Sequence, residues 1–127
     1  MMRKSAFTIL LLGATTLIAA CGVCEEKPLS EISSPNGDYV AAVYRRNCGA
    51  TSRLLYHVNI RKRWSWFSSD DRGVIEDGQV FLTDVGRVNI VWKDNKTLLV
   101  DCDGCPTDSQ PVMESSWKEV NISYQLH

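Results

Sequence analysis

The sequence predicts an all-β fold: a small antiparallel meander of about six strands, sandwich-like or partly rolled into a barrel, after an N-terminal signal helix. Three observations lead to this prediction. Residues 56–61 alternate apolar and polar side chains, as a half-buried strand does. Turn sequences rich in Pro, Asn, Asp and Gly separate short β-branched and aromatic runs. No stretch after the signal shows a sustained apolar period of 3.6 residues.

The first residues have the order of a secretory signal. Arg3 and Lys4 precede an apolar stretch over residues 6–20, which ends in two alanines directly before Cys21. About fourteen apolar or small residues are fewer than the roughly 20 that a membrane-spanning helix needs. We therefore expect this segment to be cleaved.

The sequence L-I-A-A-C-G at residues 17–22 resembles the lipobox of bacterial lipoproteins. The resemblance implies that Cys21 receives diacylglycerol, becomes the new N-terminus and anchors the chain to a membrane. Lipoproteins kept in the inner membrane often carry an Asp where this chain has Gly22. The implied location is the outer membrane, facing the periplasm, in a cell with two membranes, and otherwise the outer face of the cell membrane. The alternative is an ordinary signal peptide with Cys21 next to the cut.

Length and charge limit the class of protein. We expect a signal peptide over residues 1–20, a lipidated N-terminus and tether over 21–30, and one β-rich domain over 31–127. Cleavage leaves 107 of the 127 residues and removes two cations, so that 12 basic residues face 15 acidic ones. This acidic surplus disfavours nucleic acid as a partner. No cofactor is indicated.

The strands are predicted in order along the chain. The turn SPNG leads into a β-rich run over residues 39–47, and the alternating segment 56–61 follows it. The alternation places His57 on the polar face, where we expect a surface residue and not a catalytic base. Asp94 and Asn95 mark a hairpin turn. The remaining predicted strands are the runs at 78–84, 87–92, 98–100 and 118–126.

Four cysteines remain beside Cys21, namely Cys24, Cys48, Cys102 and Cys105. Outside the cytoplasm an even set in a small domain favours disulfides, and four cysteines allow three pairings. A four-cysteine zinc site is disfavoured because only one close pair is present. Residues 101–104 lack the remaining ligands of a calcium loop. No metal site is predicted.

The segment 34–52, the later run VWKDNKTLLV and the terminal VNISY resemble a family of small, uncharacterised bacterial proteins, many of them exported. The likeness covers most of residues 24–124 and is most specific in an R-x-C-G-A-T motif. The matching residues of the motif are Arg46, Cys48, Gly49, Ala50 and Thr51. The segments WSWFSSDDRG and CDGCP depart from the family. The resemblance brings no activity, and it implies that Cys24 pairs with Cys48, which leaves Cys102 to pair with Cys105.

The close pair of Cys102 and Cys105 has an alternative interpretation as a redox-active C-x-x-C motif. Reactive thiolates need nearby cations or a helix N-terminus, whereas Asp101, Asp103 and Asp108 surround this pair. We therefore favour a structural disulfide over thiol-disulfide exchange.

Arg61, Arg63, Trp64 and Trp66 form a possible partner-binding segment in the run RKRWSWF. Cations interleaved with aromatic rings are typical of interfaces with lipid headgroups, acidic polysaccharide or protein. The simpler interpretation, which we favour, is a strand end whose alternate rings pack in the core.

Together these features predict a lipid-anchored envelope protein that is not an enzyme and serves as an interaction or envelope-maintenance module. Its partners would be the membrane, through the N-terminal lipid, and an envelope protein or polysaccharide. The alternatives are thiol-disulfide exchange through Cys102 and Cys105 and the binding of a cell-envelope polysaccharide.

Overall fold

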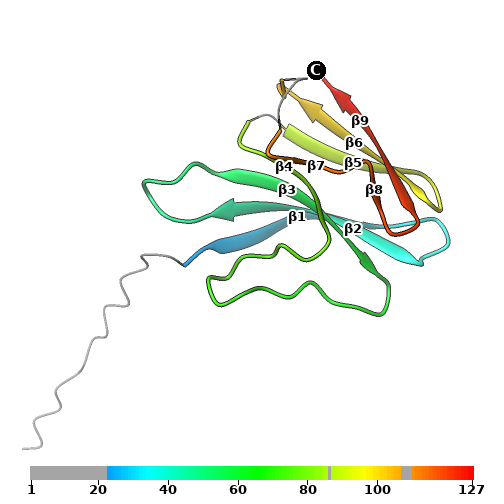
Figure 1. The fold of residues 1–127 in the computed structure, drawn as a ribbon, viewed down its shortest axis with the longest axis horizontal. Coiled ribbons are helices and arrows are strands. Elements are labelled where there is room, and N and C mark those ends of the chain that lie inside the picture. The colour runs from blue at the N-terminus through cyan, green and yellow to red at the C-terminus, as the bar shows by residue number, and fades with distance from the viewer. Residues whose placement is uncertain (1–22, 86, 107–109) are drawn as a thin grey trace, which may run out of the picture.

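The computed structural model describes residues 23–85, 87–106 and 110–127, and in these residues the chain is all-β and contains no helix (Figure 1). The expected signal helix and Cys21 lie outside the described residues. The strands are β1 (Glu25–Ser33), β2 (Tyr39–Asn47), β3 (Leu55–Lys62), β4 (Gln79–Thr83), β5 (Arg87–Asp94), β6 (Thr97–Asp103), β7 (Val112–Met113), β8 (Ser116–Trp117) and β9 (Val120–Leu126).

The strands form two sheets that pack face to face. The first sheet has the order β1-β2-β3-β4-β7, and the second has the order β5-β6-β9-β8. Buried residues of both sheets make up one hydrophobic core. The all-β, sandwich-like prediction is therefore confirmed, and the sheets do not close into a barrel (Figure 1).

Three details differ from the predicted meander. The described residues form nine strands, of which β7 and β8 have only two residues each. β9 pairs with β6 in parallel, with Leu98 opposite Ile122. This happens because the chain leaves β6, pairs with β4 through β7 and then returns to the second sheet. β1 begins at Glu25, so the domain starts within the segment 21–30 that the sequence assigned to the tether.

The alternation in β3 places its apolar side chains in the core between the sheets. Val58 and Ile60 are buried there, next to Ala41 and Val43 of β2. The second sheet contributes large side chains to the same core. These are Ile90, Leu98, Val100, Val120 and Ile122.

The first sheet is also covered on its other face. β2 is buried from Tyr39 to Tyr44, which means that both of its faces are shielded from solvent. Segment 63–78, which we call the cover loop, leaves β3 and crosses this outer face before it enters β4 (Figure 1). Gly78 ends the loop with a positive φ of 68° against the backbone of Ile60.

Candidate functional site

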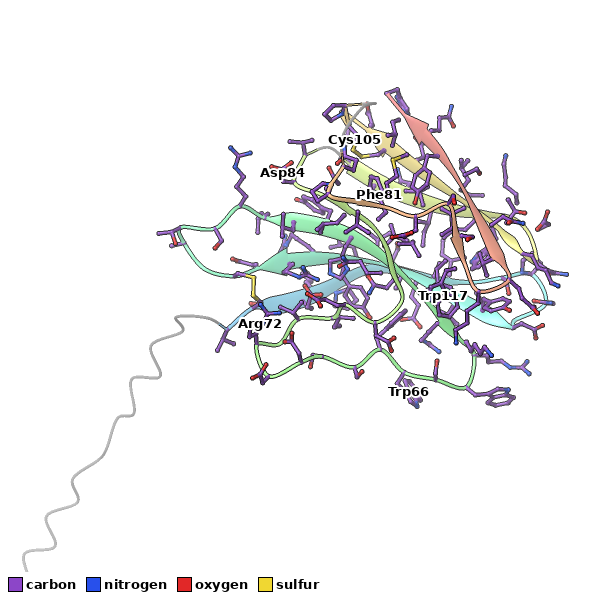
Figure 2. All side chains as sticks on the ribbon, viewed as in Figure 1. Trp66, Arg72, Phe81, Asp84, Cys105 and Trp117 are labelled. Atoms are coloured by element: carbon purple, nitrogen blue, oxygen red, sulfur yellow. A yellow bond between two sulfur atoms is a disulfide. The ribbon has the colours of Figure 1, made fainter. Side chains whose placement is uncertain are left out.

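The start of the cover loop exposes two tryptophans. Trp64 is 82% exposed and Trp66 is 81% exposed, and Figure 2 shows Trp66 pointing away from the sheets. The interpretation that alternate rings pack in the core is therefore wrong for both tryptophans. Only the ring of Phe67 packs against the domain, and it lies edge-on against Tyr44 on the outer face of the first sheet instead of in the core between the sheets.

Two arginines lie against these rings. The guanidinium carbon of Arg63 lies 4.3 Å from the centre of the Trp64 ring. The guanidinium carbon of Arg61 lies 5.5 Å from the ring centres of both Trp66 and Phe67. Such cation–π contacts hold exposed rings and cations together. We call Arg61, Arg63, Trp64 and Trp66 the aromatic–cationic surface.

Arg61 is fixed in place by further contacts. Its Nη2 forms an ion pair of 2.7 Å with Oε1 of Glu31, and its Nη1 donates to the carbonyl of Ser65 at 2.9 Å. The loop backbone therefore turns around this guanidinium, which keeps the first part of the cover loop ordered next to β3.

An open pocket adjoins the aromatic–cationic surface. It has a volume of about 220 Å³ and is lined by Asp38, Tyr39, Lys62, Arg63 and Trp64. The backbone N–H of Arg63 donates to the carbonyl of Asp38 at 2.9 Å, which joins the start of the loop to the turn before β2. The pocket thus combines one aromatic wall with charged groups of both signs.

A buried polar cluster lies under the cover loop. Its members are Glu26, Arg46, His57 and Asn59. The expectation that His57 is a surface residue is wrong, because its side chain is fully buried and stacks on the ring of Tyr44. Arg46 Nε donates to Glu26 Oε1 at 3.0 Å, and His57 Nε2 lies 2.5 Å from Glu26 Oε2.

The hydrogen bonds of Asn59 determine the proton positions in this cluster. Asn59 Nδ2 donates to the carbonyl of Asp77 at 2.8 Å, so Asn59 Oδ1 faces Nδ1 of His57 as an acceptor. His57 Nδ1 therefore carries a hydrogen. A second proton is then needed between His57 Nε2 and Glu26 Oε2, since two lone pairs would repel at this distance.

The pKa of the Glu26 carboxyl is lowered. Burial alone would raise this pKa, but the hydrogen bond and charge of His57 and those of Arg46 outweigh burial. Glu26 is therefore held as a carboxylate between two donors.

The polar cluster ties the cover loop to the sheet. Arg46 Nη2 donates to the carbonyl of Ile75 at 3.1 Å, and the N–H of Ile75 donates to Glu26 Oε2 at 3.3 Å. Because these side chains are buried and bonded to one another and to the loop backbone, the cluster acts as a structural clamp.

Both disulfides that the family resemblance implies are present. Cys24 and Cys48 join the start of β1 to the end of β2, with their Cα atoms 4.0 Å apart. Cys102 and Cys105 pair at the end of β6. In the second pair Cys102 is 0% exposed and Cys105 is 4% exposed. An attacking thiolate cannot reach sulfurs that are buried in this way.

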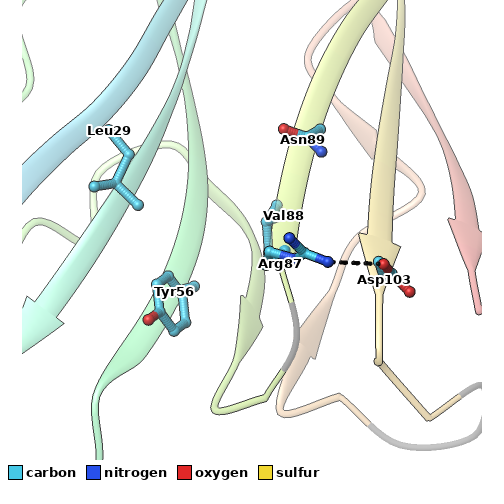
Figure 3. Close-up of a pocket in the computed structure, with 6 residues that line it drawn as sticks. All are labelled: Leu29, Tyr56, Arg87, Val88, Asn89 and Asp103. Carbon is cyan, nitrogen blue, oxygen red and sulfur yellow. Dashed lines mark hydrogen bonds and ion pairs between the residues drawn. The ribbon is translucent and has the colours of Figure 1, made fainter.

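A cleft opens between the two sheets on the side of β1 and β5 (Figure 3). It has a volume of about 530 Å³, and Leu29, Tyr56 and Val88 supply its apolar lining. Arg87 and Asp103, which face each other on β5 and β6, form an exposed ion pair of 3.5 Å at its rim, and such surface pairs contribute only about 0–1 kcal/mol. Trp92 Nε1 donates to the carbonyl of Ile32 at 2.9 Å and joins the sheets further along.

The described residues contain no group of three or more His, Cys, Asp or Glu side chains that could hold a metal ion. Within the same residues no helix is long and apolar enough to cross a membrane. No protein-family model, curated protein or solved structure matches this chain. The candidate site is therefore identified from the structure alone. It is the aromatic–cationic surface, whose two tryptophans are 82% and 81% exposed.

Proposed function

We propose that this chain is a lipid-anchored envelope protein that is not an enzyme and binds an envelope partner through the aromatic–cationic surface. The observation that carries the proposal is the exposure of Trp64 and Trp66, each with an arginine against its ring. Tryptophan and arginine are the residues most enriched among those that dominate binding energy at interfaces. Large exposed rings on an otherwise well-packed small domain favour a binding role.

The proposed location follows from Cys21 and Gly22. A lipid on Cys21 would anchor the domain at the outer membrane facing the periplasm, or at the outer face of the cell membrane if there is only one membrane. Replacing Cys21 with Ala should move the protein from the membrane fraction to the soluble fraction or leave it uncleaved. Labelled lipid on the Cys21→Ala variant would contradict the proposed anchor.

Photo-crosslinking in cells tests the binding role. A photoreactive side chain placed at position 64 or 66 should form a crosslinked product with an envelope component after irradiation. The matched control is the same side chain at Val91, which is 50% exposed on the second sheet. Equal products from all three positions, or no product at 64 and 66, would remove the support for a partner at this surface.

Thiol-disulfide exchange through Cys102 and Cys105 is the less favoured candidate, because both cysteines are buried. Maleimide trapping of the native protein after mild reduction should label neither thiol until the protein is unfolded. Rapid labelling of the folded protein would favour exchange.

A further inference from the structure

The aromatic–cationic surface lies at the opposite end of the first sheet from the anchored terminus. At one end Glu25 pairs with Asn47, next to the Cys24–Cys48 disulfide. At the other end Tyr39 pairs with Lys62, and the loop with Trp64 begins there. β2 connects the two ends through nine residues, a length of about 30 Å at roughly 3.3 Å per residue.

A short tether keeps the anchored end near the lipid. Cys21 and Cys24 are three residues apart, and three residues span at most about 11 Å. A lipid on Cys21 therefore places the membrane close to the disulfide end of the domain. The tryptophan end lies about one strand length from this tethered end, so the short tether does not by itself hold the tryptophans at the anchoring membrane.

The shape of the surface favours an extended polymer. The pocket beside Trp64 has about 220 Å³, which is below the roughly 300–1,000 Å³ of clefts that enclose a small ligand. Arg63 lies over one face of the Trp64 ring, and the high exposure of this residue leaves the opposite face free. One unit of a repeating molecule can enter the pocket while its neighbours contact the exposed rings.

The chemistry of the surface favours sugar rings that carry carboxylates. An indole face is electron-rich, so it attracts the weakly positive C–H groups on the flat side of a pyranose ring. Asp38 and Lys62 at the pocket offer an acceptor and a donor for hydroxyl groups. Within the described part of the chain neither Lys62 nor Arg63 forms an ion pair, so both cations remain available for an anion.

We infer that the aromatic–cationic surface and its pocket bind a carboxylate-bearing polysaccharide that lies a domain length from the anchoring membrane. The inference rests on the proposed function and names the partner class of the same surface. The protein would thus connect the membrane that holds its lipid to a polysaccharide layer in front of it.

Polygalacturonate and its methyl ester test this inference, because they share a sugar backbone and differ in the carboxylate charge. The probes are added to the full-length protein as processed by cells and purified in detergent, and tryptophan fluorescence is recorded. Binding should shift the emission of the exposed indoles to shorter wavelength with polygalacturonate. The ester should bind at least about tenfold more weakly, a difference of roughly 1.4 kcal/mol. Added salt should weaken the binding of polygalacturonate and leave the binding of the ester unchanged.

Variants separate stacking from charge. Trp64→Ala and Trp66→Ala should each reduce the affinity for polygalacturonate by about tenfold, as for interface residues that dominate binding. The double variant Lys62→Gln/Arg63→Gln should reduce the affinity for polygalacturonate by a similar factor. It should also remove the preference for polygalacturonate over its methyl ester. The matched controls are Val91→Ala and Lys93→Gln, which change exposed residues of the second sheet and should bind like the parent protein.

Two outcomes would overturn the inference. The first is equal affinity for polygalacturonate and its ester, or no binding of either by a protein that is folded by circular dichroism. The second is a tryptophan emission shift with vesicles of anionic phosphatidylglycerol that Trp64→Ala and Trp66→Ala abolish, without binding to the polysaccharide, since the lipid anchor alone would bring every variant to the vesicles. Crosslinking from position 64 in cells would still support the proposed function in both cases, so failure of the inference and failure of the proposed function are distinguishable.

Discussion

Glu26 has Arg46 and His57 as neighbours in a place where its side chain is almost fully shielded from solvent. Its carboxylate accepts from Arg46 and lies against the ring of His57, and it also receives the N–H of Ile75. Removing one partner of a buried ion pair leaves the other charge without compensation, which costs more than the pair itself contributes. The stability of the cover loop therefore depends strongly on this single carboxylate.

Glu26→Gln should lower the free energy of unfolding by about 3–5 kcal/mol, because the amide has no charge to compensate Arg46 and replaces one acceptor oxygen by an NH2 donor. Urea unfolding followed by circular dichroism measures this change. Glu25→Gln is the control, because Glu25 is exposed. This substitution should lower the free energy of unfolding by no more than about 0.5 kcal/mol. Equal effects of the two substitutions would show that the buried cluster does not clamp the loop.

The lowered pKa of Glu26 predicts how stability depends on pH. Because the pKa is lower in the folded than in the unfolded state, the contribution is fully present above the unfolded value of about 4.5. It is lost as the pH falls from there through the folded pKa, since protonation then favours the unfolded chain. Stability measured from pH 6 down to pH 3 should fall more steeply for the parent protein than for Glu26→Gln.

His57 shows what can be predicted for a single residue and what cannot. The alternation in β3 correctly assigned His57 and Asn59 to the face opposite Val58 and Ile60. It gave the wrong exposure, because that face is covered by the loop instead of water. The path of a loop without periodicity is determined by distant contacts, such as the bond from Arg46 to Ile75, which no local pattern reveals.

At the scale of elements, the cover loop depends on glycine where it meets β3. A Cβ at Gly78 would overlap the carbonyl oxygen of Ile60, and its φ of 68° is one that side chains rarely adopt. Ile60 belongs to a central strand and cannot move aside without disturbing the core. The loop can therefore approach the strand closely only through a residue without a side chain.

Gly78→Ala should destabilise the protein by more than about 1 kcal/mol, because strain and overlap add. Gly49→Ala is the matched control, since Gly49 also has a positive φ but has open space around its Cβ position. Thermal unfolding should therefore show a larger fall in Tm for Gly78→Ala. A larger fall for Gly49→Ala would mean that the close approach to Ile60 is not important.

The two disulfides should contribute unequally to stability. Cys24 and Cys48 are 24 positions apart, and closing a loop of this size contributes about 3–4 kcal/mol in the chain-entropy description. Cys102 and Cys105 are 3 positions apart, and the same description gives at least about 1 kcal/mol less. Replacing each pair by Ala and measuring urea midpoints tests this order. A greater loss from the shorter loop would contradict it.

Predictability also differs among the elements. β2, β3, β4, β5, β6 and β9 were predicted because their apolar runs or alternation are clear. β1 was assigned to a tether because it is an edge strand with charged residues and Pro28 and shows no apolar alternation. Its strand conformation comes from its pairing with β2, which the sequence of β1 alone does not reveal. β7 and β8 are too short to have any period.

At the scale of the whole molecule, the second sheet is organised around the last strand. β9 lies between β6 and β8, and its buried Val120 and Ile122 join the common core. Tyr124 reaches the first sheet, where its hydroxyl donates to the carbonyl of Val80 at 3.1 Å. The two sheets therefore depend on each other through this strand.

Deleting residues 120–127 should abolish cooperative unfolding of the entire domain, because it exposes the core side of both sheets. Near-ultraviolet circular dichroism and a urea titration measure the loss. His127→Ala is the control, since this exposed side chain contacts only the surface carboxylates of Asp101 and Asp103, and its loss should change stability by less than about 1 kcal/mol. A truncated protein that still unfolds in one sharp transition would contradict the central role of β9.

The central position of β9 also determines when this chain can fold. A strand that pairs with β6 across the connection through β7 and β8 cannot be inserted until its own residues are available. While Val120–Leu126 remain inside a ribosome or a translocation channel, the second sheet lacks its middle strand and the core stays open. The native state can therefore form only after Val120–Leu126 have emerged, and until then the earlier strands lack the partner that closes their core.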